Sequence, residues 1–144
     1  MRDARVWQRV LGVERIVVEE VGFDDRADAV VVSVRPRKGA VRRCGRCGRR
    51  GPWYDRGEGR RRWRALDLGT VRVFLEADSR RVRCPLHGPT VVQVPWARHG
   101  AGHTRAFDET VAWLAVRTSK SAVTELMRVG WRTVGSIVTR VQAD

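Results

Sequence analysis

Cysteine, lysine and long apolar runs are all scarce in this sequence. Its three cysteines are an odd number, which argues against a framework built only from intramolecular disulfides. The longest apolar stretches, such as Ala29–Val32, are far too short to cross a bilayer. No apolar segment follows Met1, because Arg2 and Arg5 interrupt the start of the chain, so no secretory signal is expected. These absences predict a soluble, non-secreted, cytoplasmic protein.

Acidic residues are scarce as well. The 144 residues include 16 Asp and Glu against 29 Lys and Arg, of which only Lys38 and Lys120 are lysines, and the formal net charge is +13. Thirteen basic and two acidic residues lie between Arg35 and Arg64. Repulsion among these positive charges favours a polyanionic partner. Arginine suits phosphate and the guanine edge, although a GC-rich genome would also favour its codons. Nucleic acid is favoured over a membrane surface, because no basic amphipathic helix or lipidation motif is present.

The first two thirds of the chain carry mostly β-strand patterns. Apolar residues at helical spacing predict one short helix over residues 4–11. Valine-rich or alternating segments bounded by turn residues then predict two β-hairpins and a last short strand. These strands are expected at residues 14–21 and 29–35, at 61–66 and 71–78, and at 91–94.

Three cysteines and one histidine form two matched pairs. Cys44 and Cys47 have C-x2-C spacing, Cys84 and His87 have C-x2-H spacing, and glycines flank both pairs. Tetrahedral zinc takes four thiolate or imidazole ligands from two such knuckles. We therefore expect one structural Zn2+ ion in a closed site that stabilises a small, highly charged domain. The alternative is a redox pair at Cys44 and Cys47, which would leave the second pair as coincidence and usually occurs in a βαβ context.

The pattern becomes helical from about residue 105. Residues 95–104, rich in glycine, histidine and proline, are interpreted as a linker. Apolar spacing then predicts three helices, the last two over about 121–128 and 131–141, and Ser119 or Ser121 can cap the second. The predicted fold class is α+β, with a small antiparallel β zinc-binding domain at 1–94, a linker at 95–104 and a three-helix helix-turn-helix bundle at 105–144.

The last two predicted helices and the glycine turn between them are typical of a helix-turn-helix motif, whose second helix reads DNA. If Val134 and Ile137 face the core, the opposite face can reach bases or phosphates in the major groove, and Gly135 permits close approach. The predicted contacts on this face are Arg132, Thr133, Ser136 and Arg140. The alternative is an ordinary three-helix bundle with a solvated polar face.

Two basic runs at residues 60–64 and 80–83 include interleaved apolar side chains. On strands, alternate residues share a face, so each run would form a cationic strip for a phosphate backbone. The alternative is a solvated edge strand protected against aggregation. His99 and His103 have poor ligand spacing and are interpreted as linker residues or phosphate contacts. The predicted backbone contacts are Arg60, Arg61, Arg62, Arg64 and Arg81, together with Lys120 beside the helix-turn-helix.

Several of these motifs together resemble the N-terminal part of bacterial transposases of the insertion-sequence L-three (ISL3) family. The resemblance covers about residues 12–142 and rests on the C-x2-C knuckle and on the stretches at 63–69, 80–85, 95–100 and 119–123. It implies a zinc-binding domain and a helix-turn-helix that recognise terminal inverted repeats, followed by an RNase-H-like domain with a DDE carboxylate triad. The family often has cysteine where this chain has His87. Because this chain stops at Asp144, we expect no catalytic site in it.

The leading hypothesis is sequence-specific binding of double-stranded DNA by a truncated or stand-alone, non-catalytic transposase region associated with the bacterial nucleoid. It would act as a homodimer or with a partner that supplies a catalytic domain. One alternative is a domesticated transcription regulator or repressor. Another is a zinc-dependent module that binds protein or RNA. Binding to duplex DNA and to RNA, compared at several salt concentrations, separates these hypotheses.

Overall fold

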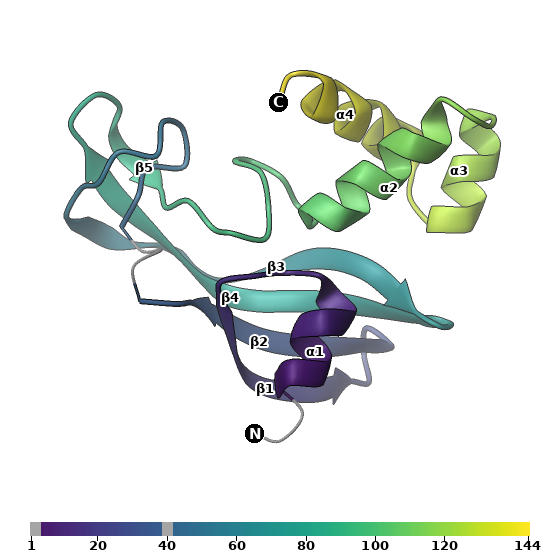
Figure 1. The fold of residues 1–144 in the computed structure, drawn as a ribbon, viewed down its shortest axis with the longest axis horizontal. Helices are drawn as coiled ribbons and strands as arrows, with labels where there is room; N and C mark the ends of the chain where they lie inside the picture. Colours follow the sequence, from purple (N-terminus) through teal and green to yellow (C-terminus); the bar gives the residue numbers. More distant parts are fainter. Residues whose placement is uncertain (1–3, 39–41) are drawn as a thin grey trace. The chain divides into compact units, whose positions relative to one another are not determined.

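The computed structural model describes residues 4–38 and 42–144 and divides the chain into two compact units, Met1–Thr104 and Arg105–Asp144 (Figure 1). Among the described residues, the first unit contains one helix and a five-stranded sheet and the second contains three helices, so the coarse α+β class is confirmed. None of the helices in the described residues is long and apolar enough to cross a membrane.

The sheet of the first unit is mixed, so the prediction of a purely antiparallel sheet was wrong. Its strands run in the order β1-β2-β4-β3, with β5 paired to β4. The β1–β2, β3–β4 and β4–β5 pairs are antiparallel, whereas β2 and β4 are parallel, with Ala29 opposite Arg72 and Ser33 opposite Glu76. The strands are β1 (Ile16–Asp24), β2 (Ala29–Pro36), β3 (Trp53–Leu68), β4 (Val71–Cys84) and β5 (Gly88–Val91).

Strands β3 and β4 are much longer than the sequence pattern indicates. β3 begins at Trp53, inside the glycine-rich stretch, and its pairing with β4 is interrupted between Asp55 and Gly59. Gly57 and Gly59 adopt φ angles of 57° and 77°, in the left-handed region that glycine enters without steric cost. The glycines therefore form bulges within a strand, which hides its alternation in the sequence.

The core of the first unit lies between the sheet, helix α1 (Ala4–Leu11) and residues 95–104. Trp96 is 1% exposed and meets Trp63 edge-on, with ring centroids 5.3 Å apart. The backbone of Arg64 accepts a hydrogen bond from Thr104 N–H and donates one to the carbonyl of Gly102. Residues 95–104, expected as a linker, are therefore packed into the first unit.

The second unit consists of α2 (Arg105–Ala115), α3 (Lys120–Met127) and α4 (Trp131–Gln142), and with α1 the described residues form four α-helices. The Ser119 hydroxyl caps α3 by accepting a hydrogen bond from Ala122 N–H at 3.1 Å. α3 ends at Met127 and is followed by its C-cap, Arg128, in a left-handed conformation, and the turn leads to α4 at Trp131. The fully buried apolar side chains at the centre of this unit are Phe107, Val111, Val123 and Ile137.

Candidate metal centre and nucleic-acid interface

The four predicted metal ligands come together in the first unit. Cys44 and Cys47 lie in the segment between β2 and β3, and Cys84 and His87 lie at the turn between β4 and β5. Their ligand atoms all lie within 4.8 Å of one another. The two buried ligands, Cys44 and Cys84, form a small apolar cluster with Val82 and Val92 that is separate from the main core. The long β3–β4 hairpin thus brings together two knuckles that are distant in the sequence.

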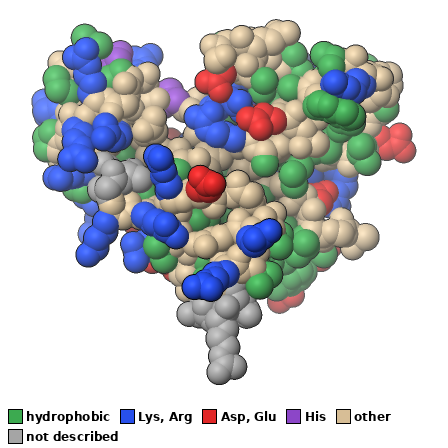
Figure 2. Space-filling model, in the orientation of Figure 1, with side chains coloured by type: hydrophobic (Ala, Val, Ile, Leu, Met, Phe, Trp, Pro, Cys, Tyr) green, Lys and Arg blue, Asp and Glu red, His purple; other side chains and the backbone are tan. Residues whose placement is uncertain are grey.

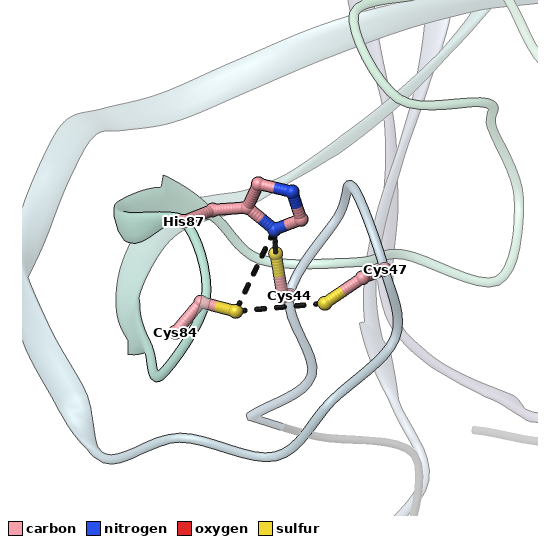
Figure 3. Close-up of side chains that lie close together, drawn as sticks. All are labelled: Cys44, Cys47, Cys84 and His87. Atoms are coloured by element: carbon pink, nitrogen blue, oxygen red, sulfur yellow. Dashed lines mark hydrogen bonds between the residues drawn. The ribbon is translucent and has the colours of Figure 1, made fainter.

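The geometry of the four side chains fits a tetrahedral zinc ion. Sγ of Cys47 lies 3.5 Å from Sγ of Cys84, and Nδ1 of His87 lies 3.7 Å from Sγ of both Cys44 and Cys84 (Figure 3). Zinc–ligand bonds of about 2.0–2.3 Å at tetrahedral angles separate two thiolates by about 3.8 Å and a thiolate from an imidazole nitrogen by about 3.6 Å. The cluster therefore has the donor types and spacing of a structural zinc site, and Nδ1 is the histidine atom directed into it.

Backbone groups of the knuckles favour thiolates at this site. Arg46 N–H donates to Sγ of Cys44, and Leu86 N–H donates to Sγ of Cys84, each at 3.4 Å. Burial raises the pKa of the Cys84 thiol, but hydrogen bonds from the backbone of His87 and Leu86 and from Cys47 outweigh it and lower this pKa to about 6. Because the thiolate is the form that binds metal, the lowered pKa favours metal binding by Cys84, whereas the pKa of Cys47, despite a backbone hydrogen bond from Arg49, is raised by burial and the neighbouring cysteines.

The first knuckle is tied to β5 and to the segment after it by backbone hydrogen bonds. Gly45 N–H donates to the Val91 carbonyl at 3.0 Å, and Gln93 N–H donates to the Arg43 carbonyl at 2.7 Å. A Cβ at Gly45 would overlap the Val91 carbonyl oxygen and the His99 ring, so the knuckle requires glycine there. His99 therefore packs against the knuckle, and burial, with smaller contributions from nearby arginines, lowers its pKa.

Helix α4 presents a polar face opposite its buried side chains. Val134 and Ile137 are 2% and 0% exposed and pack in the second unit's core. Arg132 and Ser136 are exposed, and Thr133 is half-buried, as expected for the outward side of a reading helix. The exposed side chain of Thr139 lies on the same side, seven residues after Arg132, and was not among the predicted contacts although its helical spacing indicates it.

Two other predicted DNA contacts in the second unit have internal partners. Arg140 donates to both carboxylate oxygens of the fully buried Asp108, at 3.1 Å and 3.2 Å. Nζ of Lys120 lies 5.1 Å from the ring centre of Trp131, which is 55% exposed at the start of α4. The same amine lies 3.6 Å from the position that a Cβ at Gly135 would take. Lys120 therefore covers Gly135, whereas Arg140 joins α4 to α2.

The predicted arginines of the sheet are held by internal contacts. Arg64 is 7% exposed and pairs with Asp67, and the guanidinium of Arg61 lies over Trp63 and donates to the Ala101 carbonyl. The other three form cross-strand or turn ion pairs. These pairs are Arg60 with Glu76 and Asp78, Arg62 with Asp24 and Glu76, and Arg81 with Asp55. Local ion pairs thus neutralise much of the positive charge on these strands.

Comparison with known proteins matches both units. The zinc finger of transposases IS204/IS1001/IS1096/IS1165 matches residues 40–87, and the helix-turn-helix domain of transposase family ISL3 matches residues 92–142. Two curated relatives from Mycobacterium tuberculosis, strains CDC 1551 / Oshkosh and ATCC 25618 / H37Rv, are each 63% identical over the whole of this chain. Each is a transposase for insertion sequence element IS1557, and the chain spans 34% of its length. No solved structure matches the chain.

The matched regions coincide with the described sites. The zinc-finger match contains all four clustered ligands, and the helix-turn-helix match contains α2, α3 and α4. The 63% identity extends over both units. The chain is therefore similar to ISL3-family transposases over their zinc-finger and helix-turn-helix regions.

Proposed function

We propose that this chain binds double-stranded DNA with sequence preference and recognises the terminal inverted repeats of an insertion sequence. The observation that carries this proposal is the outward face of α4, which lies in a helix-turn-helix that matches the transposase family. Its exposed Arg132 can donate two hydrogen bonds to a guanine edge, and Thr133 and Ser136 can contact bases or phosphates. The role is binding in the bacterial cytoplasm, at the nucleoid, with strand chemistry supplied elsewhere in the transposase or by a partner.

In this proposal the α4 contacts divide into two groups. Arg132, Thr133 and Ser136 face outward and specify the sequence, whereas Arg140 supports the helix through its pair with Asp108. Lys120 is exposed beside Trp131 and gives a positive charge for phosphate near the start of α4. The distinction matters, because a substitution at Arg140 would alter folding before it altered base readout.

The metal's proposed role is structural. Protein ligands would fill all four tetrahedral positions of one zinc ion and would leave none for substrate. These ligands are Cys44, Cys47, Cys84 and His87. When bound, zinc supplies a cross-link between two chain segments that the β3–β4 hairpin brings together. The protein's own contribution is the set of backbone donors at Arg46 and Leu86, which orient the thiolates.

Fluorescence anisotropy tests the proposal with three probes: an inverted-repeat duplex, a scrambled duplex and an RNA of the same length. We expect preference for the inverted repeat and a steep salt dependence. Arg132→Ala should reduce the preference by about 1–3 kcal/mol. Arg117→Ala is the matched control, because Arg117 lies over Trp113, outside α4.

Equal affinity for the repeat and the scrambled duplex, or equal losses in both arginine variants, would contradict the assignment of α4 as the reading helix. Preference for RNA would favour an RNA-binding module, and metal-dependent strand cleavage by this chain would contradict the binding-only role. A homodimer would place two chains on a palindromic site, and analytical ultracentrifugation of the complex would detect the second chain by its mass.

A further inference from the structure

The first unit carries a second set of arginines, of which only Arg83 belongs to a predicted basic run. Arg46, Arg49 and Arg50 lie in or just after the first knuckle, and Arg83 directly precedes Cys84 of the second. We call these four the knuckle arginines. All four are exposed, and none of them forms an ion pair with a carboxylate within residues 4–38 and 42–144. Their positive charge is therefore available to a partner.

This set contrasts with the arginines of the sheet. Arg60, Arg62 and Arg81 lie within ion-pair distance of acidic side chains, and the hydrogen bond from Arg62 lowers the pKa of Asp24. Binding a phosphate with those guanidiniums would first require breaking contacts that the folded protein already makes. An unpaired arginine has no such cost and releases a counterion from DNA directly. The knuckle arginines thus add uncompensated positive charge beside the metal ligands.

Local structure fixes the positions of the knuckle arginines. Cys44 N–H donates to the Arg49 carbonyl at 2.8 Å, and Arg50 forms a β-bridge with Arg43. The chain then passes so close to Arg83 that a Cβ at Gly51 would overlap the Arg83 carbonyl oxygen. The two knuckles therefore lie against each other, and their arginines are presented from adjoining segments whose four metal ligands cluster. Figure 2 shows Lys and Arg side chains gathered over this part of the first unit.

An aromatic side chain adds to this surface. Tyr54 is 44% exposed, and the guanidinium of Arg83 lies 4.9 Å from its ring centre. Stacking on the ring restricts the guanidinium's orientation without using its N–H donors, which stay available to hydrogen-bond phosphate. Arg81 lies over the same ring at 5.0 Å, but its donors are used by Asp55. Arg83 thus differs from its near neighbour in having no carboxylate partner.

We propose that the knuckle arginines form the phosphate-binding surface of the first unit and dock it on the backbone of duplex DNA. This inference rests on the proposed DNA-binding function and specifies which residues of the first unit carry it. Each arginine contacts phosphate rather than a base edge, so the surface contributes affinity and salt dependence without sequence preference. The zinc ion's contribution is to hold two arginine-bearing segments in one orientation.

The test compares two triple variants that remove the same number of charges. The knuckle variant is Arg46→Gln, Arg49→Gln and Arg50→Gln, and the sheet variant is Arg60→Gln, Arg62→Gln and Arg81→Gln. Binding to the inverted-repeat and scrambled duplexes is measured from about 0.05 to about 0.3 M salt. We expect the knuckle variant to lower the slope of log Kd against log salt by about 2–3 for both duplexes. The sheet variant should change it by less than about 1, because its arginines are already paired.

A third variant, Arg46→Lys, Arg49→Lys and Arg50→Lys, retains the charge and should restore most of the slope. Zinc content and thermal unfolding establish that each variant is folded. As an independent readout, duplex DNA should protect the knuckle arginines, but not Arg56, from phenylglyoxal in the wild-type protein. Equal slope losses in the two triple variants, or an unchanged slope in the knuckle variant, would overturn the inference while the sequence preference of α4 stood. Absence of duplex binding by the wild-type chain would instead overturn the proposed function itself.

Discussion

Asp108 on α2 accepts two hydrogen bonds from Arg140 on α4 and is completely buried. An ionised carboxylate without a partner would be very costly at such a position, so the pair determines how α4 packs on α2. The arginine that the sequence suggested as a DNA contact is thereby part of the internal structure of the helix-turn-helix. The outward face of α4 is therefore narrower than the predicted one, which included Arg140, and Arg132 and Ser136 lie at its centre.

Asp108→Asn should therefore destabilise the second unit strongly. It removes the buried negative charge and leaves Arg140 without its ionic partner, which costs about 3 kcal/mol or more for a buried pair. Urea unfolding followed by circular dichroism measures the loss. Arg105→Ala is the control, because it breaks the exposed pair with Asp144 and should cost less than about 1 kcal/mol. Similar losses in the two variants would mean that burial of the Asp108–Arg140 pair has no energetic consequence.

Ser119→Ala should lower the stability of the second unit by about 1 kcal/mol. The change removes the hydroxyl that accepts a hydrogen bond from Ala122 N–H at the start of α3. Ser121→Ala, inside the first turn of the same helix, should change stability by less than about 0.5 kcal/mol. Thermal unfolding of both variants distinguishes the cap from the general effect of replacing serine by alanine, and a larger loss at Ser121 would be inconsistent with the cap.

Arg64→Ala should act on folding and leave DNA binding by the folded protein unchanged. Arg64 is buried and pairs with Asp67, so its removal should destabilise the first unit by about 2 kcal/mol. Arg56→Ala, at an exposed position on the same strand, should cost less than about 0.5 kcal/mol. If Arg64→Ala instead weakened the affinity for every duplex at temperatures where it is fully folded, Arg64 would have to be accessible to phosphate.

Elemental analysis of the purified protein should give one zinc ion per chain. Cys84→Ser should lower the zinc content and the unfolding temperature of the first unit, because it removes one of four clustered ligands. Leu86→Ala is the control in the same knuckle, since that side chain is 63% exposed and is not a ligand. Folded wild-type protein that contains no zinc and reacts freely with thiol reagents before any chelator is added would rule out the metal site.

The ion pair between Asp24 and Arg62 predicts part of the acid sensitivity. The hydrogen bond from Arg62 lowers the pKa of Asp24 below 3.8 in the folded state, so the pair stabilises the fold above pH 3.8. That contribution is lost as the pH falls from 3.8 through the folded pKa. Asp24→Asn should therefore reduce stability at pH 7 and flatten its decline below pH 3.8. Urea unfolding at pH 7 and below pH 3.8 should show the same two changes in Arg62→Gln. If stability declined below pH 3.8 as steeply in these variants as in the wild type, the pair would not contribute to acid sensitivity.

Local signals in the sequence predicted much of both units. The C-x2-C and C-x2-H spacings identified the four residues that cluster, and serine placement predicted a cap at Ser119 or Ser121, of which Ser119 is the cap in the structure. Helical periodicity predicted α2, α3 and α4 within one or two residues at most of their ends. Each of these features depends on residues that are close in the chain, where spacing alone determines which side chains share a face.

Features that depend on distant residues were not predictable in this way. The parallel register of β2 with β4 joins two hairpins, and neither hairpin carries a local signal for it. The partners of Arg140 and Arg62 lie 32 and 38 residues away, so the sequence could not distinguish paired arginines from free ones. Residues 95–104 have loop composition, and the burial of Trp96 against Trp63 depends on tertiary packing.

The parallel pairing of β2 with β4 has a consequence for how the chain is made. During synthesis β1 and β2 can close their hairpin early, but the other edge of β2 stays open until the ribosome has produced the knuckle segment, β3 and then β4. An open, valine-rich edge is a template for association with another nascent chain. Slow or interrupted translation between residues 37 and 70 should therefore favour aggregation over correct assembly of this protein.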